Sequence, residues 1–151
     1  MDFEILFSML ESAVSSTEAV SVQAEFFRKL YADASLRALP FVNAFLIVSG
    51  WLGTSLRSGV WTFYEATPQQ DVQAAAGYLE QSGFAELAAM LQKGIHDYQA
   101  PQYQADFDYP EEWITESEEI DRWITAHEDA ILHHLTDELL RRRQELTEAI
   151  R

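Results

Sequence analysis

The sequence contains no cysteine. This excludes disulfide bonds, thiolate ligands for a metal and a cysteine nucleophile. Basic residues are also scarce: Lys and Arg number 10 against 25 Asp and Glu, which gives a formal net charge of −15 at pH 7. Because nucleic acids and anionic membranes bind positively charged surfaces, we expect the protein to bind neither of them directly. A charge of this sign favours a basic partner, or serves only solubility.

No hydrophobic run reaches the length of a membrane span. The most apolar stretch, residues 41–52, is interrupted by Asn43 and Gly50, which indicates a buried helix. At the N-terminus, Asp2 and Glu4 stand where a signal peptide needs basic residues. We therefore expect a cytoplasmic protein.

Recognised catalytic motifs are absent as well. The sequence has no G-x-S-x-G, no P-loop, no dinucleotide-binding fingerprint and no H-E-x-x-H pattern. His127 and His134 share one face of a helical pattern, near Glu128 and Glu138, but a metal site would need ligands that converge from a second helix. We interpret them as half-buried histidines of an amphipathic helix, and we predict no catalytic residues, no metal and no cofactor.

Helical periodicity is present in almost every segment. A chain of 151 residues with 48% hydrophobic content is suited to one domain with a substantial core. We predict a single compact all-α domain over residues 1–151, with about six or seven helices and a long C-terminal helix. The expected helices cover residues 3–14, 16–34, 40–58, 67–82, 84–95 and 115–149, and residues 60–64 form a short helix or a buried turn.

Local signals predict where these helices begin and which side they bury. Thr67 and Pro68 suit the N-cap and first position of a helix, and residues 115–118 match a capping box that opens the last helix. Pro101 and Pro110 exclude a continuous helix between residues 99 and 110. The inward side chains expected for the helix at 16–34 are Val20, Phe27, Leu30, Tyr31 and Ala34.

The strongest charge feature is the stretch 106–129, which holds ten carboxylates and a single basic residue, Arg122. Aromatic residues are interleaved with these acids, which favours a folded surface over a disordered tail. We expect Trp113 and Trp123 to anchor the stretch against the core. Its acids crowd the N-terminal half of the last helix, where the helix dipole favours negative charge, so part of the run has a structural explanation.

The same acids are candidates for binding a partner. Carboxylates three or four residues apart on a helix are separated by about 5–6 Å, a distance of the same order as that between successive phosphates of a DNA strand. Such a surface attracts the basic groove of a DNA-binding protein, such as a transcription factor. The predicted partner-binding residues are Asp106, Asp108, Glu111, Glu112, Glu116, Glu118, Asp121, Glu128 and Asp129.

Gly59, Phe63, Tyr64 and the run 83–91 (GFAELAAML) carry a family resemblance. They are similar to the signature N-G-G-F-x-Q-F/Y-F-x-N and the following helices of a bacterial family of small acidic all-helical proteins, named for its DNA-mimic member. The resemblance covers about residues 40–145. It implies an all-α fold, a possible homodimer and an acidic surface that occupies the DNA-binding face of a basic protein. The chain departs from the signature at Arg57, Ser58, Val60, Thr62 and Ala66.

Two other functions remain open on the sequence. A metal-dependent hydrolase would use Glu116, Glu119 and Asp121, with or without His127, since acid pairs of this kind hold Mg²⁺ in all-helical nucleotide pyrophosphatases. An immunity protein or antitoxin would bind a basic toxin through the same acidic surface.

Overall fold

The computed structural model describes residues 2–105 and 108–151 of the chain. In that part the chain forms ten helices and no strand, which confirms the predicted all-α class and the long C-terminal helix. No helix of these residues is both long and apolar enough to cross a membrane. The helices are α1 (Phe3–Ser12), α2 (Ser16–Ala32), α3 (Ala34–Arg37), α4 (Pro40–Ser58), α5 (Trp61–Ala66), α6 (Gln69–Gln81), α7 (Ala85–Lys93), α8 (Pro101–Gln104), α9 (Glu111–Arg141) and α10 (Arg143–Ile150).

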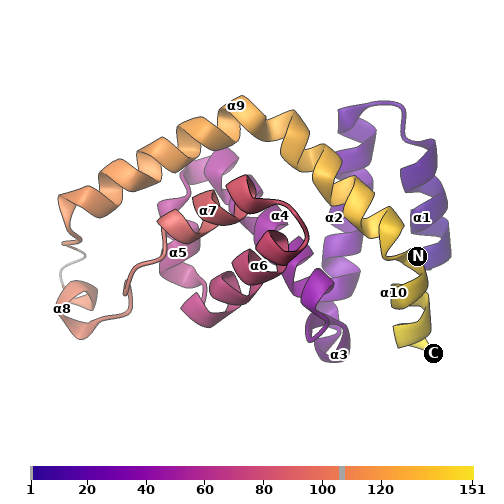
Figure 1. The fold of residues 1–151 in the computed structure, drawn as a ribbon, viewed down its shortest axis with the longest axis horizontal. Coiled ribbons are helices and arrows are strands. Elements are labelled where there is room, and N and C mark those ends of the chain that lie inside the picture. Colours follow the sequence, from indigo (N-terminus) through magenta and orange to yellow (C-terminus); the bar gives the residue numbers. More distant parts are fainter. Residues whose placement is uncertain (1, 106–107) are drawn as a thin grey trace.

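Helix α9 spans the molecule from end to end (Figure 1). It arches over α4, α5, α6 and α7, then crosses α2 and reaches α1 and α10, where both chain termini lie. Its inward stripe is Ile120, Ile124, Ile131, Leu135 and Leu139, all nearly inaccessible to solvent. A single helix therefore joins the central helices to the α1–α2 hairpin.

The central element is α4, as its high hydrophobicity predicts. Pro40 occupies its first turn, where the missing N–H costs nothing. Trp51 is fully buried, and its indole Nε1 donates to the Tyr64 hydroxyl at 2.9 Å, which donates in turn to the Leu91 carbonyl at 2.6 Å. Burial raises the pKa of the Tyr64 hydroxyl, so this hydroxyl keeps the proton that it donates. This chain of hydrogen bonds fixes α5 and α7 against α4.

The number of helices differs from the prediction because three short helices were not expected. Asp33 ends α2 and its carboxylate accepts from the backbone of Ser35 and Leu36, which starts the four-residue helix α3. Helix α8 is another four-residue helix, and a break at Arg142 separates α10 from α9. The segment at 61–66 is a short helix, as expected. Thr67 does not cap α6, which begins after Pro68.

The buried face of α2 also differs from the prediction. The side chains of Val22, Gln23 and Phe26 are buried, as is Leu30, whereas Val20 and Tyr31 are exposed. The reason is Gln23, whose side-chain Nε2 donates to the Leu132 carbonyl at 3.0 Å and to Thr136 Oγ1 at 2.8 Å. A polar residue with satisfied hydrogen bonds thus belongs to the inner face, and the helix is rotated accordingly. Ala34, also expected inward, is exposed at the start of α3.

The start of α9 is a further correction, because the helix begins at Glu111, four residues before the predicted capping box. The Thr115 hydroxyl does not cap. It donates to the carbonyl of Glu111 at 3.2 Å, and Ser117 donates likewise to Trp113 at 2.9 Å. These are the i to i−4 bonds of hydroxyl residues inside a helix. Pro110 takes the N-cap position, and the first turn carries two carboxylates that complement the helix dipole.

Candidate partner-binding surface

The first turn of α9 is attached to the body of the protein through aromatic side chains. Trp113 stacks on the His96 ring, with centroids 4.5 Å apart and planes 7° apart, and it packs edge to face against Tyr98 and Tyr103 at 5.0 Å. Trp123 stacks on His127 at 4.2 Å, and its Nε1 donates to a Glu86 carboxylate oxygen at 3.2 Å. Both tryptophans therefore pack against the core, as expected of anchoring residues.

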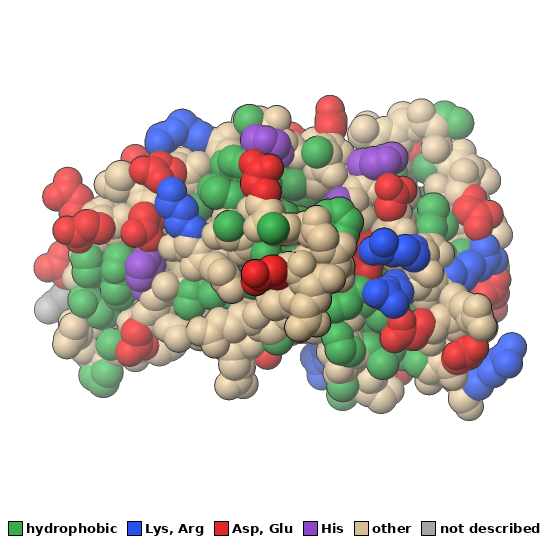
Figure 2. Space-filling view, viewed as in Figure 1, with side chains coloured by type: hydrophobic (Ala, Val, Ile, Leu, Met, Phe, Trp, Pro, Cys, Tyr) green, Lys and Arg blue, Asp and Glu red, His purple; other side chains and the backbone are tan. Residues whose placement is uncertain are grey.

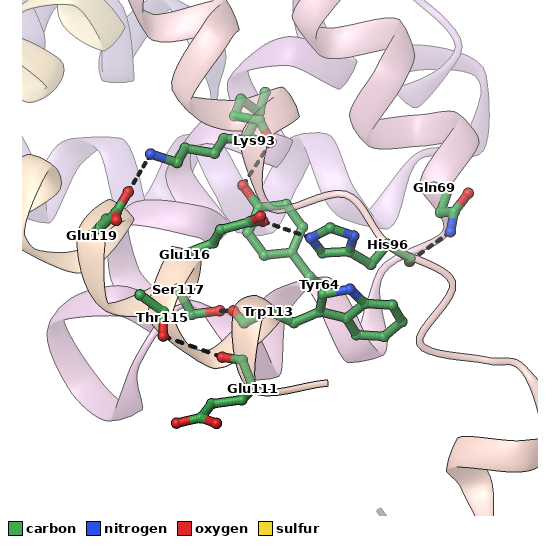
Figure 3. A network of polar contacts seen from close by, with 11 residues as sticks. Tyr64, Gln69, Lys93, His96, Glu111, Trp113, Thr115, Glu116, Ser117 and Glu119 are labelled. Carbon is green, nitrogen blue, oxygen red and sulfur yellow. Dashed lines mark hydrogen bonds and ion pairs between the residues drawn. The ribbon is translucent and has the colours of Figure 1, made fainter. Parts of the chain in front are cut away.

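Two carboxylates of this part of α9 contact the C-terminal end of α7 and the segment that follows it. Glu116 lies 2.7 Å from His96 Nε2, and Glu119 pairs with Lys93, as Figure 3 shows. The hydrogen bond and charge of Lys93 hold the pKa of Glu119 below its ordinary value. Glu116 thus contributes to docking α9 on the body, although the sequence predicts it as a partner-binding residue.

Asp121 has a structural role at the junction of α4 and α5. Its Oδ1 accepts from the Ser55 hydroxyl at 2.6 Å and from the Val60 backbone N–H at 2.9 Å. Between these residues the chain turns at Gly59, whose φ of 97° is a conformation that residues with a Cβ rarely adopt. The carboxylate therefore supplies the hydrogen-bond acceptor for a tight turn, and it is only partly accessible to solvent.

The remaining predicted acids have a different environment. Within the described residues they form no ion pair and accept no hydrogen bond through their side chains. All are exposed except Glu128, which is half-buried. Asp106 lies outside the described residues. The members of this set, called here the free carboxylates, are Asp108, Glu111, Glu112, Glu118, Glu128 and Asp129.

The free carboxylates are arranged in a sparse row. Glu111, Glu118 and Asp129 are separated by seven and eleven residues, which is close to two and three turns, so they share the outer face of α9. Along the helix axis the two intervals are about 10 Å and about 16 Å, from a rise of 1.5 Å per residue. Phosphates of one DNA strand recur every 3.4 Å or so along the duplex axis. The row therefore reproduces the sign of a duplex's charge and not the spacing of its phosphates.

Charge is distributed unevenly over the molecule. Figure 2 shows acidic side chains gathered at the end where α9 begins, and basic ones among acids near α10 at the other end. Much of that basic charge is paired internally: Arg143 contacts Glu4 and Glu11, and Arg142 contacts Glu138. One apolar side chain, Ile114, remains 46% exposed among the free carboxylates. It lies off the apolar stripe of α9, and that position is the signal by which sequence analysis could have identified it.

The histidines and the proposed metal ligands do not converge. His127 Nδ1 lies 2.8 Å from the Trp123 carbonyl, and His134 packs on Phe84 with ring centroids 4.1 Å apart. Burial lowers the pKa of His134. The three carboxylates of the hydrolase alternative each contact a different part of the body. Over residues 2–105 and 108–151, no group of three or more His, Asp or Glu side chains is placed to hold a metal ion.

Comparison of the chain with models of known protein families, with characterised proteins and with solved structures gives no significant match.

Proposed function

We propose that this chain is a non-enzymatic binding protein, and that its acidic α9 surface occupies the DNA-binding surface of a basic protein such as a transcription factor. The observation that carries the proposal is the division among the acids of α9. Glu116, Glu119 and Asp121 are used for docking and for a turn, whereas the free carboxylates have no internal partner within the described residues. Because no internal cation pairs with them in the described part of the chain, their negative charge is available to a basic partner.

The electrostatic field of the whole surface, and not a phosphate-by-phosphate match, supplies the attraction in this proposal. A net charge of −15 and the row of free carboxylates produce a negative potential that attracts a basic groove over a Debye length of about 8–10 Å at physiological salt. Ile114 offers an apolar contact within that field. The resemblance to the DNA-mimic family, carried by Gly59, Phe63 and Tyr64, supports the same partner class.

The test is capture of a partner followed by competition. The immobilised protein is exposed to a cytoplasmic extract of its own source, and bound proteins are eluted with salt. The expected result is a basic DNA-binding protein that the chain and a DNA duplex bind competitively. A captured protein that binds its duplex and this chain at the same time would contradict the proposal.

A pair of matched variants locates the binding surface. Glu111→Gln with Glu118→Gln removes two free carboxylates, and Glu80→Gln with Glu148→Gln removes two exposed carboxylates from α6 and α10. Both variants change the net charge by the same amount. The first should weaken capture strongly and the second only slightly. Equal losses would indicate that total charge, and not the α9 surface, determines binding.

A further inference from the structure

A groove of about 740 Å³ lies between the α1–α2 connection and the C-terminal half of α9. Figure 1 shows α9 passing beside this hairpin on its way to α10. Apolar side chains line the groove, among them Leu10, Leu132 and Leu140. Val14 stands at its edge and is 88% exposed, more than any other large hydrophobic residue of the described chain. Leu10 is buried, whereas Leu132 and Leu140 are partly exposed, so the groove presents apolar side chains to solvent beside polar ones such as Ser15 and Thr136.

The exposure of Val14 is not the result of a loose connection. The Ser15 hydroxyl accepts from the Glu18 N–H at 3.2 Å, and a Glu18 carboxylate oxygen accepts from the Val14 N–H at 3.0 Å. These two bonds resemble a capping box, except that Glu18 accepts from the residue before the N-cap, and they fix the chain as it enters α2. The backbone of Val14 is therefore held in place while its side chain faces solvent, at the cost of an exposed apolar group.

The charges around the groove select the kind of partner. Glu11, Asp129 and His133 line it, and no Lys or Arg does. Glu11 is paired with Arg143, whereas Asp129 has no ion-pair partner within the described residues. Asp129 is one of the free carboxylates and lies on the same face of α9 as Glu118, so the groove continues the acidic surface described above. A second copy of the chain would bring further acids to these positions. A basic segment would complement them.

We propose that this groove receives an amphipathic basic helix of the partner protein. One face of that helix places apolar side chains against Val14, Leu132 and Leu140, and a lysine or arginine beside that face approaches Asp129. This is the helix-in-groove mode of recognition, in which apolar residues at helical spacing supply affinity and flanking charges supply orientation. The inference rests on the proposed function and adds a second apolar contact to the one at Ile114.

The test uses two model peptides of equal length and equal lysine content, one an amphipathic Leu/Lys helix and the other with each Leu replaced by Gln. Their binding to the full chain is measured by fluorescence anisotropy. The Leu/Lys peptide should bind roughly tenfold more tightly, a difference equivalent to burial of one or two apolar side chains. Val14→Ser should remove most of this difference. The matched control is Leu56→Ser in α4, a residue 48% exposed outside the groove, which should leave the difference unchanged.

The outcomes separate this inference from the proposed function. Equal binding of the two peptides, or an unchanged preference in Val14→Ser, would overturn the groove while leaving charge-driven binding intact. Absence of binding by both peptides at low salt would count against both proposals. Sedimentation that shows a dimer in the wild type and a monomer in Val14→Ser would assign the groove to a second copy and overturn the inference.

Discussion

Asp121 and Glu118 lie three residues apart on α9, yet substitution of Asp121 should lower the stability of the protein much more than substitution of Glu118. Asp121→Ala removes the acceptor of two hydrogen bonds, from Ser55 and from the Val60 N–H, and Val60 itself is fully buried. Hydrogen bonds to a charged group contribute about 1.5–3 kcal/mol each. Because Asp121 is partly solvated, we take the lower value for each bond and expect a loss of about 3 kcal/mol in the free energy of unfolding. Glu118→Ala removes an exposed carboxylate and should change it by less than about 0.5 kcal/mol.

Urea denaturation followed by circular dichroism measures both changes, and the slope of the transition should remain constant. Asp121→Asn keeps a side-chain oxygen that can accept both bonds, so it should lose only about 1 kcal/mol, the difference between charged and neutral acceptors. A variant Asp121→Ala as stable as the wild type would refute the structural role of this carboxylate. A comparable loss in Glu118→Ala would refute the assignment of Glu118 to the free set.

Two further predictions concern stability. Burial lowers the pKa of His134 below 6.5, so the unfolded chain binds more protons at this site. Stability should therefore fall as the pH falls through 6.5, and His134→Gln should flatten this dependence in denaturation measured as a function of pH. Arg143 pairs with Glu4 at 2.5 Å and with Glu11 at 2.6 Å, so Arg143→Ala should loosen the contact between α10 and α1 and accelerate amide exchange in α1. Exchange that accelerates equally in α4 would argue against a local effect.

The class of fold could be predicted because it depends on periodicity. The apolar stripes of α4 and α9 recur over several turns, and their spacing is incompatible with strands. The glycine at the end of α4 was also apparent from the sequence, and a short helix was one of the two structures expected for the segment after it. Elements of four residues such as α3 and α8 were not, because their stability comes from tertiary contacts and not from their own propensity.

The two larger errors have identifiable causes. The pattern Thr115-x-x-Glu118 satisfies the rule for a capping box. Packing of Trp113 on His96, however, extends the N-terminal end of the helix by about one turn, to Glu111. On α2, the spacing of apolar residues could not predict that Gln23 is buried, because its hydrogen-bond partners lie on α9, more than a hundred residues away. In both cases a long-range contact overrides a local signal.

The sequence predicts the acidic stretch, but not which of its carboxylates bind other parts of the protein and which remain free. Sequence spacing treats all acids of the stretch alike. Which of them are internal depends on where Lys93, His96 and the α4–α5 turn are positioned, and these lie tens of residues earlier in the chain. The groove at Val14 likewise requires the α1–α2 hairpin and α9 to be side by side.

The central claim is that the free carboxylates of α9, and not total charge, bind a basic partner. The most direct test is the salt dependence of the dissociation constant of the captured partner, measured from about 50 mM to about 500 mM salt. We predict that the wild-type affinity falls steeply and log-linearly with salt, that Glu111→Gln with Glu118→Gln weakens binding and reduces this slope, and that Glu80→Gln with Glu148→Gln preserves it. An affinity indifferent to salt over this range, or equal slopes in the two variants, would contradict the claim.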